Sequence, residues 1–396
     1  MKKHILFIVE NLPVPVDRRV WSEALAVKEW GYNVSIISPK GKGFTKKYEQ
    51  IEGIRIYRHP MPIEADKKWG FFFEYINALF WQTLLSIKIF FKEPFHIIHG
   101  ANPPDHIFII ALLFKLFGTK YIFDHHDIST ELYLAKYGKT DIFHKMLLLV
   151  EKINLKAADV VISTNASYKK TAINRGNKHD SEVFIVRNGP DLSRVTVTPS
   201  NIEFKEDFDY LVAYIGTMNS QEHVDNLIRI VNYIVKNKKI KNTKFIVIGP
   251  GTYVDKMIEL SEKMNLNRYI EFTGFLPYEK LLGILEQSDI CINPEHKNSY
   301  TNKSTMLKIM DYMLMGKPII QFDTIEGKVT ADDAAIYIQN NDEIAFAEAI
   351  ISLLDNQEKR KIMGEIGRKR IYESLNWELQ KVNLKQAYKY LEDRLH

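Results

Sequence analysis

Residues 4–38 read HILFIVENLPVPVDRRVWSEALAVKEWGYNVSIIS. The apolar run at 4–9 predicts a short strand, residues 18–30 have the apolar spacing of a helix, and residues 33–38 predict a second strand. Gly31 is placed to end the helix. A strand, a helix and a strand in this order form a βαβ unit, whose strands lie parallel in one sheet.

The same alternation continues along both halves of the chain. In the first half, further short apolar runs lie at 54–58, 96–99, 121–125, 160–163 and 183–186. In the second half, a new series has its apolar runs at 211–215, 245–249, 270–273, 290–293 and 319–322. Helical segments separate most of these runs, which predicts parallel sheets covered on both faces. We therefore predict an α/β protein with two Rossmann-like domains, each a doubly wound parallel sheet.

The length of 396 residues also fits two domains rather than one. We place the first domain at 1–190, a polar linker at 191–209 and the second domain at 210–376. The amphipathic segment 377–396 predicts a helix that crosses back to the first domain. Two facing domains imply a cleft with ligands at the carboxyl ends of the strands.

The composition is that of a globular protein from a reducing compartment. The chain is 45% hydrophobic and 26% charged, which excludes a disordered or collagenous chain. The single cysteine, Cys291, excludes a disulfide scaffold and a cysteine zinc site. Glu10 and Pro13 interrupt the first apolar stretch too early for a signal peptide, so we expect a cytoplasmic protein.

Positive charge is concentrated in the first half of the chain. Lys and Arg outnumber Asp and Glu by 27 to 19 through residue 190, whereas the counts after it are 27 and 30. The segment 67–95 combines lysines with many aromatic residues. One interpretation is a helix on the inner face of the cell membrane, and the other is a buried crossover helix. No nucleic-acid-binding module is recognisable, so we expect no nucleic-acid partner.

The first domain has its most informative polar stretch at the end of the strand 121–125. Asp124, His125, His126 and Asp127 are adjacent, and Glu131 follows four residues later. Neighbouring residues on an extended segment point to opposite sides, so one histidine faces the site and a metal site is disfavoured. A histidine beside carboxylates can orient a substrate hydroxyl or donate to a phosphate. The alternative is a structural histidine whose hydrogen bonds are satisfied in the domain interior.

Two other loops of the first domain lie at strand ends. Asp17, Arg18 and Arg19 open the helix after the first strand, where backbone N–H groups favour an anion. Solvated charges at the helix start explain them almost as well. Asn102 follows the strand 96–99, and the nearby Asp105 is expected to cap the next helix.

The second domain presents small and polar residues at its strand ends. Neither βαβ start carries a full G-x-G-x-x-G, so a dinucleotide cofactor is not expected. The turn of Gly274 and Phe275 can close around a base or ribose of a nucleotide. The alternative is a turn with a structural role only. The first loop can bring backbone N–H groups to an anion; its residues are Gly216, Thr217, Met218 and Asn219.

The stretch 294–318 is the most distinctive of the second domain. Ser304 is expected to cap a helix that ends before Gly316. Lys303 and Lys308 would bring positive charge to the first turns of that helix, which its dipole disfavours unless a diphosphate is bound. Lys308 and Asp311 lie three apart, so they either meet a nucleotide together or form a surface pair.

Several of these motifs occur together in one family. The chain resembles family 4 glycosyltransferases of the GT-B fold, nearest the branch of bacterial surface-polysaccharide transferases that includes the N-acetyl-fucosamine transferase. The resemblance spans nearly the whole chain. The sequence blocks that carry it are ENLPVPVDRRVWSEALAVKEWGYNVSIISPKG, NPPD, FDHHD, YIGTMNSQEHVDNL and NKSTMLKIMDYMLMGKPII, and the last two are the most specific.

The resemblance implies a nucleotide-sugar donor, usually a UDP-sugar, held mainly by the second domain. It implies an acceptor held by the first domain, retention of the anomeric configuration, and no metal or other cofactor. By position, the loop from Gly216 to Asn219 would lie against the diphosphate, and Lys308 would contact a phosphate. Asp311 would hold the ribose hydroxyls. His126, with Asp127 beside it, matches the histidine expected near the transferred sugar.

The chain departs from the family pattern at the cations and acids. The family has two glutamates eight apart, whereas Lys303 stands at the first position and Asp311 at the second. The usual arginine and lysine after the first strand of the second domain are missing; Thr217 and Met218 stand near the former and Glu222 near the latter. We therefore expect Lys303 and Lys308 to supply the positive charge.

These features predict an enzyme that moves a hexose or N-acetylhexosamine from a UDP-sugar to a growing, lipid-linked glycan. Asp17, Arg18, Asn102 and Glu131 are the candidates for the acceptor side. Two alternatives stay open: a UDP-sugar 2-epimerase of the same architecture, and a non-catalytic subunit that docks on an active transferase.

Overall fold

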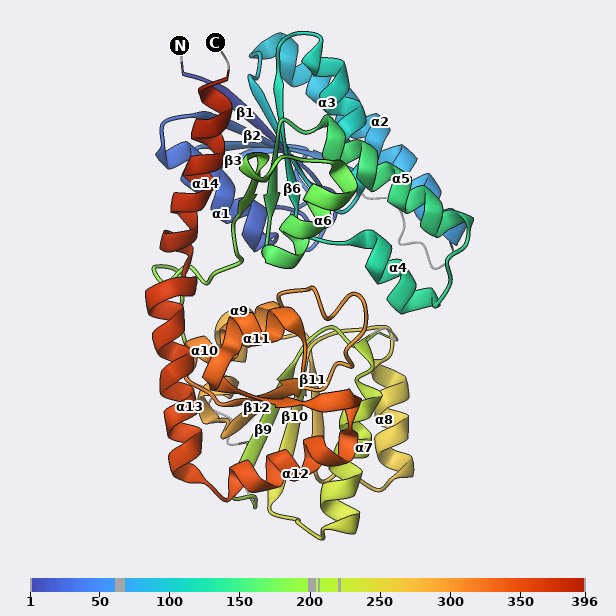
Figure 1. Ribbon diagram of the computed structural model, residues 1–396, viewed down its shortest axis with the longest axis vertical. Helices are drawn as coiled ribbons and strands as arrows, with labels where there is room; N and C mark the ends of the chain where they lie inside the picture. Colours follow the sequence, from blue (N-terminus) through green and yellow to red (C-terminus); the bar gives the residue numbers. More distant parts are fainter. Residues whose placement is uncertain (1, 61–67, 199–203, 206, 220–221, 395–396) are drawn as a thin grey trace. The chain divides into compact units, whose positions relative to one another are not determined.

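The computed structural model describes residues 2–60, 68–198, 204–205, 207–219 and 222–394, with the backbone alone for 68–74. The chain divides into two compact units (Figure 1). The first unit holds Met1–Leu134, Lys139–Arg187 and Glu378–His396, and the second holds Ala135–Gly138 and Asn188–Trp377. Each unit is an α/β domain, so the predicted fold class is confirmed.

The first domain is built on an eight-stranded sheet of order β3-β4-β2-β1-β5-β6-β7-β8. All neighbours pair in parallel except β3 and β4. The strands are β1 His4–Ile8, β2 Asn33–Pro39, β3 Tyr48–Ile51, β4 Ile54–His59, β5 Ile97–Ala101, β6 Lys120–His125, β7 Val160–Ser163 and β8 Val183–Ile185. The helices are α1 Arg18–Glu29, α2 Lys68–Lys92, α3 Phe108–Lys115, α4 Ser129–Tyr137, α5 Ile142–Ala157, α6 Ala166–Gly176 and α14 Trp377–Glu392.

The second domain is built on a six-stranded, fully parallel sheet of order β11-β10-β9-β12-β13-β14. Its strands are β9 Tyr210–Ile215, β10 Thr243–Ile248, β11 Ile270–Gly274, β12 Ile290–Asn293, β13 Ile319–Phe322 and β14 Ala335–Ile338. Its helices are α7 Asp225–Asn232, α8 Val254–Lys263, α9 Tyr278–Gln287, α10 Leu307–Leu314, α11 Ile325–Ala331, α12 Glu343–Leu354 and α13 Gln357–Arg370.

Both sheets bury side chains on both faces, as parallel sheets require. In the first domain, Leu6 and Ile8 join the cluster beneath α2, α3 and α5. Phe7, on the other face of the same strand, stacks on His99 at 4.4 Å between ring centroids. In the second domain, alternate residues of β9 likewise join two separate clusters. Strands buried on both faces explain why the apolar runs in the sequence are continuous.

The last helix, α14, packs on the first domain, as predicted. Tyr388 is fully buried, and its hydroxyl lies 2.7 Å from Nδ1 of His99 on β5. Near the end of the helix, Glu392 accepts hydrogen bonds from Lys3 at 2.8 Å and from Tyr32 at 2.7 Å. These contacts join the C-terminal end of the chain to β1 and the end of α1.

The segment expected as a linker, 191–209, is instead partly packed into the second domain. Phe204 is 4% exposed and belongs to a core cluster of this domain, and Leu192 and Val195 pack against that cluster. Residues 199–203 and 206 lie outside the described residues. The polar composition of the segment led to the linker prediction, although a few apolar side chains anchor it to the domain core.

Helix α2 contains most of the aromatic stretch 67–95, and it fits neither interpretation fully. One stripe of the helix, with Ala78, Gln82 and Ile89, is buried, whereas Phe80 is 57% and Phe91 is 85% exposed. Residue 67 and the side chains of 68–74 lie outside the description. Among the described residues, we find no helix with the length and apolar character that a bilayer crossing requires.

Candidate functional site

In the second domain, two loops meet at the carboxyl ends of β9 and β10. The N–H of Met218 donates to the carbonyl of Pro250 at 2.8 Å, and the N–H of Tyr253 donates to the carbonyl of Met218 at 2.9 Å. A Cβ on Gly249 would lie 2.0 Å from the carbonyl oxygen of Gly216, and one on Gly251 would lie 2.0 Å from that of Met218. Glycine is therefore required at both positions for the loops to touch.

Helix α10 places a lysine directly beneath the first of these loops. Nζ of Lys308 pairs with the carboxylate of Glu295 and lies 3.2 Å from the hydroxyl of Tyr214. A Cβ on Gly216 would lie 2.7 Å from this Nζ and 2.3 Å from the Tyr214 hydroxyl. The Lys308 and Glu295 side chains are only 11% and 5% exposed. The loop backbone and a buried ammonium group thus face each other.

Sequence reasoning missed Glu295. It lies two residues beyond the end of β12, near the carboxyl end where a parallel sheet presents its ligands, and this position was the signal that could have identified it. The Tyr214 hydroxyl also donates to Glu295 at 3.2 Å. Glu295 therefore balances the charge of Lys308 in the free protein.

Of the two interpretations of Lys308 and Asp311, the surface pair does not form, because the side chains have different partners. Asp311, 8% exposed, accepts a hydrogen bond from the hydroxyl of Tyr278 at 2.7 Å. The next residue, Tyr312, accepts from the N–H of Ile215 at 2.8 Å and donates to the carbonyl of Ile292 at 3.1 Å. Through Tyr312, α10 is fixed to the ends of β9 and β12.

The predicted helix cap at Ser304 is also wrong. Helix α10 begins at Leu307 with Met306 as its N-cap residue and no side-chain cap bond. The Ser304 hydroxyl donates backwards to the carbonyl of Tyr300 at 2.9 Å. Lys303 lies in the same turn, where its N–H donates to that carbonyl at 3.1 Å. Ser304 lies two residues before the N-cap position and is therefore not the cap of α10.

The other predicted loop residues of the second domain lie at strand ends. Asn219 follows Thr217 and Met218, and its side-chain oxygen accepts from the N–H and the hydroxyl of Thr252 at 3.1 and 3.0 Å. Gly274 has φ +67° and its carbonyl accepts from the N–H of Gly249 at 3.0 Å. Phe275 is 72% exposed. An exposed aromatic ring at this edge is available for stacking.

Glu222 lies in the segment between β9 and α7, close to the loop of Gly216 to Asn219. Its carboxylate accepts from the N–H of Asn219 at 3.0 Å. Burial, together with the nearby charge of Glu295, raises the pKa of Glu222 to about 6. The loop is therefore close to neutral below that pH and carries an anion above it.

In the first domain, His126 is held by a buried carboxylate. Nδ1 of His126 lies 3.0 Å from Asp124, and the guanidinium of Arg19 binds the same carboxylate in a bidentate pair at 2.8 and 2.6 Å. Burial alone would raise the pKa of Asp124, but Arg19 and then His126 hold it well below its usual range. Burial alone would lower the pKa of His126, but Asp124 more than compensates and raises it. The imidazole thus has a charged partner at Nδ1.

Asn102 fixes the loop that carries His126. Its side-chain oxygen accepts the N–H groups of His126 and Asp127 at 2.9 and 3.0 Å. Its amide donates to Asp105 at 2.8 Å and to the carbonyl of Asp127 at 2.7 Å. The expected helix cap at Asp105 is wrong, because Ile107 is the N-cap residue of α3 and Asp105 turns back to Asn102. Asn102 is 1% exposed and acts as a positioning residue.

The remaining predicted residues of the first domain lie in different surroundings. Asp17 is the N-cap of α1 and accepts from the N–H of Val20 at 3.1 Å. Arg18 is exposed, whereas Arg19, expected beside it as an anion ligand or a solvated charge, is buried in the pair with Asp124. Glu131 is 3% exposed and forms an ion pair with Arg175 inside the domain.

Three buried groups near His126 have the geometry of metal ligands. Atoms of Glu23, His99 and Asp124 lie within 4.8 Å of one another. The guanidinium of Arg19 also lies among them, 2.6 Å from Asp124 and 3.2 Å from Glu23. Because Arg19 already supplies the positive charge there, these groups form an ion network and fit a second cation poorly.

Two family models together match almost the whole chain. The model of glycosyltransferase family 4 matches residues 16–194, and the model of glycosyl transferases group 1 matches residues 199–370. The chain belongs to the family 4, group 1 glycosyltransferases. It is an enzyme of the glycosyltransferase class, as the motifs predicted.

This glycosyltransferase is 24% identical over 383 residues to an uncharacterised glycosyltransferase of Methanocaldococcus jannaschii, covering 92% of the chain and 90% of that relative. It is 20% identical over 377 residues to CapM of Staphylococcus aureus, a capsular polysaccharide biosynthesis glycosyltransferase, covering 93% and 91%. The solved structure of Anabaena HepE in complex with UDP-glucose has a TM-score of 0.70 at 11% identity, covering 98% and 99%. These likenesses agree with the GT-B fold.

Proposed function

We propose that the enzyme transfers a hexose or N-acetylhexosamine from a UDP-sugar to a lipid-linked surface glycan, with retention of configuration. The observation that carries the donor side is the buried ammonium of Lys308 beneath Gly216. HepE, which shares the fold, is solved with UDP-glucose, and CapM takes part in capsular polysaccharide synthesis. These relatives support a nucleotide-sugar donor and a surface-glycan product.

The donor diphosphate would lie against the loop from Gly216 to Asn219. As the bond between the sugar and the phosphate breaks, negative charge develops on the leaving UDP. A buried cation and backbone N–H groups aimed at that charge lower the barrier without having to reorganise. Lys308 would exchange part of its contact with Glu295 for the phosphate, and Asp311 would accept from the ribose hydroxyls.

His126 would act on the side of the transferred sugar. Its Nδ1 is taken by Asp124, so Nε2 is the ring atom available to the donor sugar or phosphate. The raised pKa favours the protonated ring, which donates a hydrogen bond from Nε2. We expect His126→Ala to reduce kcat far more than UDP affinity. An equal loss in both would make His126 a binding residue only.

The first domain would meet the membrane that holds the acceptor. Phe80 and Phe91 on α2, and Leu116 and Phe117 after α3, are 57%, 85%, 82% and 65% exposed. Exposed apolar side chains on a domain with excess positive charge suit an anionic lipid surface. Co-sedimentation with phosphatidylglycerol vesicles tests this: Phe91→Ser with Phe117→Ser should abolish binding, and Tyr372→Ser in the second domain should not.

The deciding experiment for the function is a transfer assay with a panel of UDP-sugars. A retaining transferase forms a glycoside of unchanged anomeric configuration only when acceptor is present. Conversion of UDP-N-acetylglucosamine without any acceptor would identify a 2-epimerase instead. No heat of UDP binding, together with no turnover, would indicate a non-catalytic subunit. The family match favours the transferase over both alternatives.

A further inference from the structure

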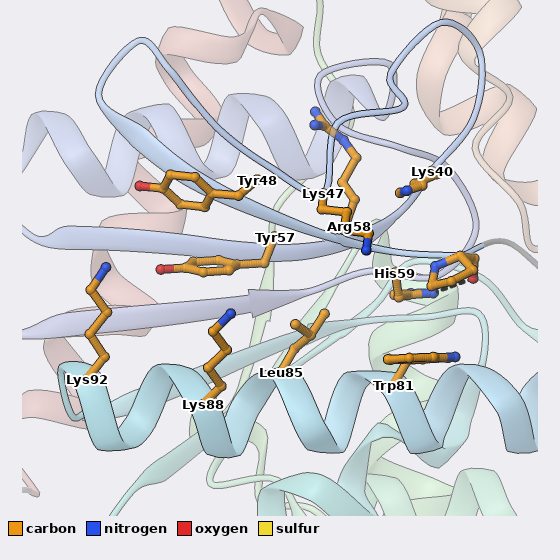
Figure 2. Close-up of a pocket in the computed structure, with 11 residues that line it drawn as sticks. Lys40, Lys47, Tyr48, Tyr57, Arg58, His59, Trp81, Leu85, Lys88 and Lys92 are labelled. Carbon is orange, nitrogen blue, oxygen red and sulfur yellow. Dashed lines mark hydrogen bonds between the residues drawn. The ribbon is translucent and has the colours of Figure 1, made fainter.

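A pocket of about 460 Å³ lies in the first domain between α2 and the strands β3 and β4. Figure 2 shows Trp81, Leu85, Lys88 and Lys92 projecting from α2 toward the strand residues. None of the residues placed in the donor or His126 sites lines it. The pocket is therefore separate from the chemistry described above.

Several lysines bring positive charge to the pocket. Lys40, Lys47, Lys88 and Lys92 line it, and none has a carboxylate partner among the residues that the structure describes. Arg58 also lines it, but its guanidinium pairs with Glu49 and donates to the carbonyl of Val14 at 2.7 Å. Like charges gathered around one concave surface raise the local potential and attract an anion.

The walls between these lysines are aromatic and apolar. The rings of Tyr48 and Tyr57 pack at 5.0 Å between centroids, and Figure 2 shows Trp81 at the other end of the pocket, on the side of His59. Tyr48 is 48% and Trp81 is 36% exposed, so both rings have free surface. An inorganic ion would leave this apolar surface in water. An anion with a carbon chain or ring attached would cover it.

We propose that this pocket binds a phosphate ester with an apolar tail. Flexible lysines act as point charges around the several oxygens of a phosphate dianion, whereas a planar carboxylate is better matched by arginine. With the phosphate near the lysines, the carbon chain attached through the ester oxygen would pack against the rings of Tyr48, Tyr57 and Trp81. The proposal stands independently of the donor and of the transfer reaction.

Direct binding of dodecyl phosphate, below the concentration at which it aggregates, tests the proposal by calorimetry. Each lysine near an anionic group contributes about a fivefold change in affinity, so Lys88→Gln with Lys92→Gln should weaken binding about 25-fold. Lys152→Gln with Lys156→Gln is the matched control, because this pair is also exposed, spaced four apart on a helix of the same domain, and removes the same charge. The control should bind like the unchanged protein.

Further probes separate the sources of the phosphate. Inorganic phosphate that competes as well as dodecyl phosphate would identify free phosphate as the ligand, and stronger binding of the alkyl ester supports the lipid type. Dodecanoate should bind more weakly, because it carries one charge. Equal binding of dodecanoate, equal losses in both double variants, or no binding by the unchanged protein would overturn the proposal. UDP binding should remain unchanged in all variants, so this test fails separately from the proposed function.

Discussion

The pair of Lys308 and Glu295 gives the sharpest prediction, because it separates folding from donor binding. Lys308→Met leaves the carboxylate of Glu295, 5% exposed, without its cation. Removing one partner of a buried ion pair costs about 3–5 kcal/mol. For a domain of this size, each kcal/mol lowers Tm by roughly 2–4 °C, so we expect a decrease of about 6–20 °C.

The second variant, Lys308→Met with Glu295→Gln, removes the unpaired charge. We expect most of the lost thermal stability to return, because a neutral amide is much cheaper to bury than a carboxylate. In both variants, UDP affinity should be about 10- to 100-fold lower than in the unchanged protein, because a charge-assisted hydrogen bond contributes about 1.5–3 kcal/mol. Thermal melts and UDP calorimetry on the same samples measure the two effects. A double variant as unstable as the single one, or one that regains UDP affinity, would refute the reasoning.

Four other changes have expected outcomes. Asp124→Asn should lower the pKa of His126, so the activity should be lost at a lower pH than in the unchanged enzyme, as a pH–rate profile would show. Gly216→Ala should weaken UDP binding without unfolding the protein, because a Cβ there would lie 2.3 Å from the Tyr214 hydroxyl and displace the loop; unchanged calorimetry would contradict this. Asn102→Ala leaves two partly buried N–H groups without their acceptor and should cost about 1–3 kcal/mol in urea unfolding. UDP affinity should fall as the pH rises through about 6, where Glu222 ionises, and Glu222→Gln should remove this step.

The sequence predicted the strands well where they are continuous and apolar. The runs 160–163, 290–293 and 319–322 coincide with β7, β12 and β13. Strand β3 was missed because Tyr48–Ile51 is a short edge strand with alternating exposed residues, and its partner β4 sets its place. Local patterning identifies buried strands but not an edge strand that depends on its neighbour.

The site was predicted less completely, because its decisive contacts join residues far apart in the chain. Lys308 was identified from its helix and from the family resemblance, but its partner Glu295 was not. Arg19 was interpreted as an anion ligand or a solvated charge at a helix start, yet it binds Asp124, which is 105 residues away. Ser304 had the residue type of a cap, but the helix begins only at Leu307, with Met306 at the N-cap position. Residue type and spacing predict where polar groups gather, and only the fold decides which of them meet.

A structure of the enzyme with UDP tests the proposed donor site directly. We expect the diphosphate at the carboxyl end of β9, with Nζ of Lys308 and the backbone N–H groups of the loop from Gly216 to Asn219 within hydrogen-bond distance of its oxygens. The ribose hydroxyls should meet Asp311. A diphosphate that lies away from this loop, with Lys308 still paired only to Glu295, would contradict the central claim.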